Sequence, residues 1–226
     1  MRTEIIGHHA FQSCRVVMEQ GEHFVSEAGK MVRMSTEIDV DVTTKKNSGG
    51  LLGGLKRLLG GDSFFFSTYT ARANDVEVVL GPILPGNIGL LDLDGSNGWY
   101  TAGGSYMASG PNIGTEPKWQ GMKGLFSGEN LVFVHCTGTG PVVLDAFGVI
   151  WEEQVDGTFI VDTGHVVAFE DTLDYEITKV GGSWLTSFLA GEGFVINFKG
   201  SGRVMVQSHN RNEFGRSLGP MLPPRG

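Results

Sequence analysis

The sequence predicts an all-β fold made of three repeated β-sandwich units in a pseudo-threefold arrangement, with one short amphipathic helix. Three observations lead to this prediction. Glycine accounts for 35 of the 226 residues, about twice the usual share of roughly 7%, which indicates many tight turns. Short runs rich in Val, Ile, Phe, Thr and Tyr lie between Gly, Asn, Asp and Pro residues, as strands lie between turns. Finally, two motifs recur three times in the same order.

The first recurring motif is a short run of residues that ends in glycine and leads into a strand. Its three copies end at Gly29, Gly103 and Gly164. Glycine suits such a turn because it adopts left-handed backbone angles without steric cost. The apolar residues that follow predict strands at Met31–Met34, Ser105–Ala108 and Val166–Phe169.

The second recurring motif is a glycine followed by an acidic residue and then an apolar strand. Its copies begin at Gly61, Gly128 and Gly191. The glycines of the first motif precede these by 32, 25 and 27 residues. The constant order predicts three homologous units, which we place at residues 1–80, 81–145 and 146–226 and expect to pack as one globular body.

The short helix is predicted at residues 51–59, inside the first unit. At 100° per residue its leucines form a stripe about 120° wide. The stripe consists of Leu51, Leu52, Leu55, Leu58 and Leu59. A helix this short does not persist alone in water, so another surface must cover it. We treat the stripe as a candidate interface, with the chain's own core, a neighbouring subunit and a membrane surface as the three alternatives.

Composition and charge limit the class of protein. With 40% hydrophobic and 19% charged residues the chain can bury a sizeable core. The net charge of −8 does not favour nucleic acid as a partner, because contacts with phosphate depend on a surplus of positive charge. The N-terminal residues contain no apolar signal segment, and nowhere do about 18 apolar residues run together. We therefore expect a cytoplasmic protein.

The spacings required for catalysis or for metal binding are missing. No serine lies in a Gly-x-Ser-x-Gly pattern. His135 and Cys136 are adjacent and would point to opposite faces of a strand, so they cannot form a catalytic pair. The six histidines form neither His-x-His nor His-Glu-x-x-His. We predict no catalytic residue, no cofactor and no metal site, and we expect Cys14 and Cys136 to be buried thiols.

Two sets of residues leave alternatives open. If a metal were bound, the first residues to examine would be His135, His165 and Asp162. The carboxylate pairs Asp92 with Asp94 and Asp174 with Glu176 would each share one face of a strand. Two carboxyl groups beside a sugar cleft can hydrolyse a glycosidic bond, so a carboxylate-based hydrolase is the remoter alternative to a solvated acidic surface.

One segment resembles a known family. The residues from Gly50 to Phe65 resemble the signature of the altered-inheritance-of-mitochondria (mitochondrial biogenesis) family, in a bacterial-type member. Residues 124–129, 161–169 and 187–193 match the same family, so the resemblance spans nearly the whole chain. It implies three β-sandwich units related to the fold of the tryptophan RNA-binding attenuation protein. The family brings no catalytic residues to carry over, and its fungal relatives are linked to organisation of the mitochondrial inner membrane.

The function that these observations favour is that of a non-enzymatic structural or interaction protein. We expect it to associate with itself, a trimer being favoured, with a membrane surface as a second candidate partner. The alternative is a protein that binds a small ligand or RNA in a groove between repeats. Basic and aromatic residues do occur together at Lys118–Trp119 and Phe214–Arg216, but base-stacking surfaces also need a positive groove beside them.

Overall fold

The computed structural model describes residues 1–43, 66–119, 132–179 and 194–223. The described chain is nearly all β, as predicted, in open antiparallel sheets. Its three-unit sandwich arrangement stays a prediction, as does its relation to the tryptophan RNA-binding attenuation protein. The predicted helix at residues 51–59 lies outside the described residues, and so does its stripe of leucines.

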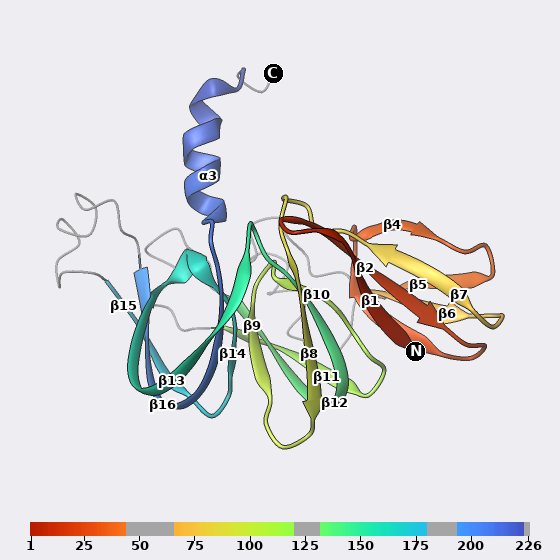
Figure 1. The fold of residues 1–226 in the computed structure, drawn as a ribbon, viewed down its shortest axis with the longest axis horizontal. Helices are drawn as coiled ribbons and strands as arrows, with labels where there is room; N and C mark the ends of the chain where they lie inside the picture. Colours follow the sequence, from red (N-terminus) through yellow and green to blue (C-terminus); the bar gives the residue numbers. More distant parts are fainter. Residues whose placement is uncertain (44–65, 120–131, 180–193, 224–226) are drawn as a thin grey trace, which may run out of the picture.

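The strands form three groups along the long axis of the molecule (Figure 1). The first group contains β1 (Arg2–His8), β2 (Phe11–Met18), β3 (His23–Glu27), β4 (Met31–Met34), β5 (Ile38–Thr43), β6 (Phe66–Ala71) and β7 (Val76–Leu80). The middle group contains β8 (Ile88–Asp94), β9 (Trp99–Ala102), β10 (Tyr106–Ser109), β11 (Ile113–Trp119) and β12 (Val132–Asp145). The third group contains β13 (Ile150–Asp162), the 3-10 turn η1 (Thr163–His165), β14 (Val166–Glu170), β15 (Asp174–Lys179) and β16 (Phe194–Gln207).

The strands that follow the first motif lie close to their predicted positions. The run predicted at Met31–Met34 is β4, and those predicted near Ser105 and Val166 are β10 and β14. One element was not predicted, namely helix α3 (Arg211–Leu218), which continues into a 3-10 turn, η2 (Gly219–Met221). Helix α3 extends away from the sheets (Figure 1).

Two sheets contain these strands. The smaller has the order β1-β2-β7-β4. The larger follows the path β13-β16-β14-β9-β12-β10-β3-β6-β5, with β8 and β11 also paired to β12 and β15 also paired to β16. Two pairings on this path join one group to the next: β10 with β3, and β14 with β9. Both junctions are antiparallel.

Strands β12 and β16 are each long enough to serve two sets of neighbours. The first half of β12 pairs with β9 and β11, and its second half pairs with β8 and β10. The strand changes partners at Gly138, whose φ is +112°. A side chain there would collide with the carbonyl oxygen of Asn112, so only glycine fits this point of the strand.

The hydrophobic core consists of three clusters, one centred on each group of strands. The largest fully buried side chains include Phe24, Met18 and Leu80 in the first cluster, Tyr106 and Leu144 in the second, and Phe133, Phe169 and Phe198 in the third. The first cluster includes Ala108 and Val143 from the middle group. Because clusters contain residues from neighbouring groups of strands, the groups pack directly against one another.

Candidate interaction surface

Strand β4 presents an exposed apolar edge. It pairs with β7, and among the described strands it has no neighbour on its other side. Three of its four side chains are apolar and exposed, by 43% at Met31, 62% at Val32 and 38% at Met34. An edge strand carries backbone N–H and C=O groups that another strand can bond, and apolar side chains favour that addition.

A second open edge belongs to β13, at the other end of the molecule (Figure 1). This strand pairs with β16 along its whole length and with no other strand of the described chain. Near its C-terminal end Ile160 is 59% exposed. Strand β4 of the first group and strand β13 of the third therefore each have an open edge, as do the marginal strands β1 and β5 of the first group.

The two internal junctions show what happens to corresponding strands when a partner is present. In β10, Ala108 lies opposite Ser26 of β3, and Ser109 lies opposite Val25. In β14, Ala168 lies opposite Thr101 of β9. Every residue of β10 and of β14 is buried, whereas every residue of β4 is exposed.

Strands β4, β10 and β14 share a specific irregularity. Their pairings with β7, β12 and β16 each skip one residue, at the second position of the strand. The skipped residues are Val32, Met107 and Val167. A bulge bends its strand and increases the local twist, so the three strands leave their sheets in the same manner.

Buried charged side chains stabilise the junction between β3 and β10. The Lys30 side chain, which follows β3, donates to Asp145 at the end of β12 over 2.6 Å, and both side chains are almost wholly buried. Arg211 of α3 also donates to Asp145, and to the carbonyl oxygen of Gly104 over 2.6 Å. Glu27 lies 3.3 Å from Lys30, and burial, partly offset by that lysine, raises the pKa of its carboxyl group. Such a network holds only while every charge keeps its partner.

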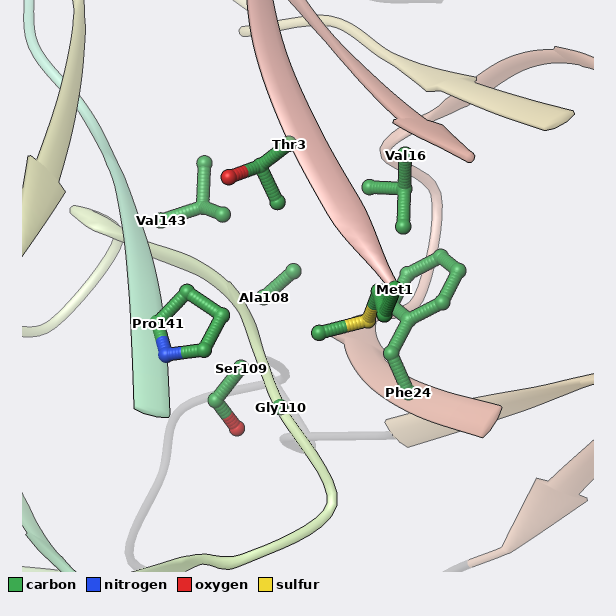
Figure 2. Close-up of a pocket in the computed structure, with 9 residues that line it drawn as sticks. All are labelled: Met1, Thr3, Val16, Phe24, Ala108, Ser109, Gly110, Pro141 and Val143. Carbon is green, nitrogen blue, oxygen red and sulfur yellow. The ribbon is translucent and has the colours of Figure 1, made fainter. Parts of the chain in front are cut away.

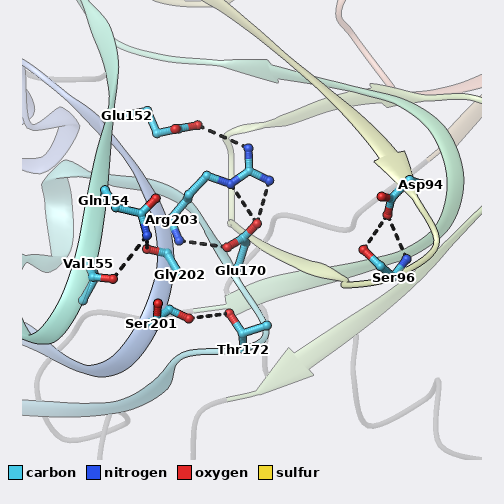
Figure 3. Close-up of polar contacts among 10 residues, drawn as sticks. All are labelled: Asp94, Ser96, Glu152, Gln154, Val155, Glu170, Thr172, Ser201, Gly202 and Arg203. Atoms are coloured by element: carbon cyan, nitrogen blue, oxygen red, sulfur yellow. Dashed lines mark hydrogen bonds and ion pairs between the residues drawn. The ribbon is translucent and has the colours of Figure 1, made fainter.

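A second polar network lies beside the other junction (Figure 3). Arg203 of β16 donates to Glu170 at the end of β14 over 2.6 Å and also lies 3.6 Å from Glu152. Its guanidinium sits 5.0 Å from the ring of Trp99 on β9. The hydrogen bond with Glu170 raises the pKa of Arg203. Through these contacts Arg203 ties β9, β14 and β16 together.

Of the carboxylates singled out in the sequence, Asp94 has structural partners. Asp94 accepts hydrogen bonds from the backbone N and the hydroxyl of Ser96, at 2.8 and 2.6 Å, and these bonds lower its pKa (Figure 3). It therefore stabilises the turn after β8. Nothing in the described residues points to enzymatic activity.

The three residues named for a metal site are engaged separately. His135 lies 2.9 Å from Asp171 through its Nε2 and stacks on Tyr100. His165 contacts the carbonyl oxygen of Gln207 over 2.8 Å through its Nδ1. Asp162 accepts from the backbone N of Gly164 over 2.9 Å. Within the described ranges, no three His, Cys, Asp or Glu residues are placed to hold a metal ion.

A pocket lies between the first and middle groups of strands, and its size decides whether it could be a ligand-binding groove (Figure 2). It is lined by Met1, Thr3, Val16, Phe24, Ala108, Ser109, Gly110, Pro141 and Val143. Its free space is about 10 Å³, which is enough for about one water molecule. This pocket cannot take a nucleotide or a sugar.

Of the three glycines of the first motif, Gly29 has a left-handed backbone, whereas Gly103 and Gly164 do not. Gly29 precedes β4 with a φ of +88°. Before β10 the left-handed residue is Gly104, with a φ of +87°, rather than its neighbour Gly103. Gly164 lies in η1, where the Asn210 side chain fills the space that a Cβ would need. Gly61, Gly128 and Gly191 lie outside the described residues.

Both cysteines are buried, as expected. Burial raises the pKa of the Cys14 thiol to about 12, so at neutral pH this group is protonated and a poor nucleophile.

Helix α3 had a recognisable signal in the sequence. The Asn210 side chain accepts from the backbone N–H groups of Asn212 and Glu213, and an acidic residue three positions after such a cap marks a helix start. In the described part of the chain, no helix has the length and apolar character needed to cross a membrane.

Comparisons with known proteins agree with the fold. The family model described as mitochondrial biogenesis AIM24 matches residues 3–209. An uncharacterised protein of Streptococcus pyogenes serotype M6 is 31% identical over 231 residues, covering 99% of this chain and 92% of the relative. An X-ray crystal structure of a Streptococcus pyogenes protein superposes with a TM-score of 0.80 at 28% identity, covering 98% of this chain and 99% of the other.

Proposed function

This chain belongs to the mitochondrial biogenesis AIM24 family, and on that premise we propose that it is a non-enzymatic structural protein that works by associating with itself. A homotrimer is the assembly that we favour, in the cytoplasm. A membrane surface is the second partner that we consider.

The observation that carries this proposal is the exposed apolar edge of β4. Single exposed apolar residues are ordinary on protein surfaces. Here three of them share one four-residue strand with an open backbone edge. Natural proteins protect such edges with charges, prolines or covering segments, because an unprotected edge joins other chains. On β4 only Arg33 offers that protection, and Glu77 of β7 pairs with it.

The pattern of strand pairing supports a chain of three equivalent units. In each group, a strand is joined by a turn to a bulged strand, and further strand segments follow. One of these segments pairs with the strand before the turn, and a later one pairs with the bulged strand. On this view β3, β9 and the end of β13 are equivalent, and so are β4, β10 and β14. Because these units pair with one another twice within one chain, the same kind of strand pairing can also join one chain to another.

The test is the mass of the purified protein in solution, measured by light scattering over a hundredfold range of concentration. We expect three times the mass of one chain at the upper end. A protein that stays at the mass of one chain throughout would overturn self-association. Adding vesicles of neutral or anionic lipid to the same samples tests the membrane surface separately, because co-sedimentation would show binding there.

A further inference from the structure

We propose that the partner of β4 is the C-terminal part of β13 in a second copy of this chain, paired antiparallel with Arg33 opposite Val161 and Met34 opposite Ile160. This inference rests on the proposed self-association and specifies the surface and the register that it uses.

The register follows from the two junctions inside the chain. In β10 and β14 the residue that follows the bulge is Ala108 or Ala168. Ala108 lies opposite Ser26, three residues before the left-handed Gly29, and Ala168 lies opposite Thr101, three residues before Gly104. Both junctions therefore obey one rule: the residue after the bulge lies opposite the residue three positions before a glycine that leads into a bulged strand.

The same rule, applied to the open edges of β4 and β13, gives one pairing. The residue that follows the bulge in β4 is Arg33. Gly164 lies two residues before β14, as Gly29 and Gly104 lie two residues before β4 and β10. The residue three positions before Gly164 is Val161. The next pair along the ladder is Met34 with Ile160, which are 38% and 59% exposed in the single chain. Burial of these two side chains contributes favourable free energy, since both lose apolar contact with water.

The pairing has to join different copies. Strand β4 lies in the first group and β13 in the third, at opposite ends of the molecule (Figure 1). Each copy then contributes its β4 to one neighbour and its β13 to another, which is a head-to-tail interface. Such an interface produces a closed ring when the rotation between copies closes and a filament when it does not.

Other strands at the margins of the sheets do not fit this rule. Strand β5 ends the larger sheet, and its Val42 is 61% exposed. In the middle and third groups the corresponding outer strands, β11 and β15, take part in neither internal junction. Val42 therefore provides a matched control, because it is an exposed apolar residue on a sheet margin outside the proposed interface.

The position of Arg33 is compatible with this pairing. It stands where the internal junctions have alanine, but its guanidinium pairs with Glu77 on the neighbouring strand β7. Because its charge is satisfied within its own sheet, the edge can be covered without leaving an isolated charge.

Cysteine cross-linking tests the register. Opposed residues of antiparallel strands bring their Cβ atoms to about 4.5–5.5 Å, close to the span of a disulfide. In the double variant Arg33→Cys with Val161→Cys, mild oxidation is expected to yield covalent dimers and larger multiples on a non-reducing gel. A mixture of the two single variants should yield dimers only. The matched control is Arg33→Cys with Glu153→Cys, which moves the second cysteine eight residues along β13 and should give little product.

The outcomes separate the two proposals. If both double variants cross-link equally, or if neither does while the protein keeps its multimeric mass, the register is wrong and self-association stands. If the unchanged protein has the mass of one chain, self-association itself fails.

Charge substitutions give an independent measurement. Met34→Lys and Ile160→Lys are each expected to raise the concentration needed for half-assembly at least tenfold, while the melting temperature of the dissociated chain stays unchanged. Val42→Lys should leave assembly unchanged. Equal effects of all three would show that assembly does not depend on this pair of strands.

Discussion

Strands β10 and β4 follow left-handed glycines, carry the same bulge and pair in the same way with β12 and β7. Yet β10 is buried at every residue and β4 is exposed at every residue. Their side chains differ accordingly. After the bulge β10 has Ala108, which fits against Ser26 of β3, and β4 has Arg33. The backbone form of a strand therefore does not decide its burial. Burial depends on whether a neighbouring strand covers it, and the side chain at the contact must fit that neighbour.

The largest effect is expected where the buried junction is broken. Asp145→Ala removes the carboxylate that faces Lys30 and Arg211. Because the buried Lys30 would then keep only Glu27 as a charged partner, we expect the free energy of unfolding to fall by about 3–5 kcal/mol. Urea unfolding measures it. Asp39→Ala is the control, since Asp39 and its partner Arg72 are exposed, and there we expect about 0–1 kcal/mol. Similar losses in both variants would contradict the role of burial.

A size substitution sharpens the comparison between the strands. Ala108→Met adds volume to a packed contact and should lower the free energy of unfolding by about 1–3 kcal/mol. Arg33→Met, at the matching position of exposed β4, should change it by less than about 0.5 kcal/mol in the dissociated chain. Denaturant titration at low protein concentration checks both. A loss at Arg33 equal to that at Ala108 would mean that β4 is covered within its own chain.

The turns that lead into the two strands should respond alike, because both require a left-handed glycine. Gly29→Ala and Gly104→Ala are each expected to lower the free energy of unfolding by about 1–2 kcal/mol. Gly104→Ala should lie at the upper end, because the added carbon would also press on the Arg211 side chain. Thermal melts measure the difference, and a neutral result at both positions would contradict a conformational role.

The smallest expected effects are changes in stability with pH. Burial raises the pKa of Glu27 at the junction above its ordinary value of 4.5, so the folded chain holds this proton more tightly than the unfolded chain. Stability from this group therefore falls as pH rises from 4.5 through the raised pKa. Glu27→Gln should gain stability relative to the unchanged protein between pH 4 and pH 7, as measured by urea unfolding at each pH.

Glu22 provides a control with the opposite sign. The N-terminal ammonium donates to its carboxylate and lowers its pKa. Its contribution is present above pH 4.5 and is lost as pH falls through the lowered pKa. Glu22→Gln should therefore lose stability relative to the unchanged protein at pH 7 and approach it in acid. If both variants shifted in the same direction, local burial and pairing would not explain the two pKa values.

Part of the fold could be predicted because its signals are local. Short apolar runs that follow a glycine placed β4 at Met31–Met34, and they placed β14 to within one residue. The same kind of local signal was present for α3, in the cap at Asn210 followed by Glu213, but a helix of eight residues among many strands is easily passed over. The left-handed turn before β10 lies at Gly104 instead of Gly103 because two glycines are adjacent there, and either one can take that backbone state.

The β class and most of the turn positions follow from the sequence alone, and so does the absence of the familiar catalytic and metal-binding spacings, because each depends on residues close together in the chain. The contact of Lys30 with Asp145, which is 115 residues away, follows only from the tertiary structure. The same is true of the neighbours that β10 and β14 have and of the open edge of β4. The physical reason is that burial and strand pairing depend on which distant segments come into contact. Three strands with the same local form can therefore have different surroundings.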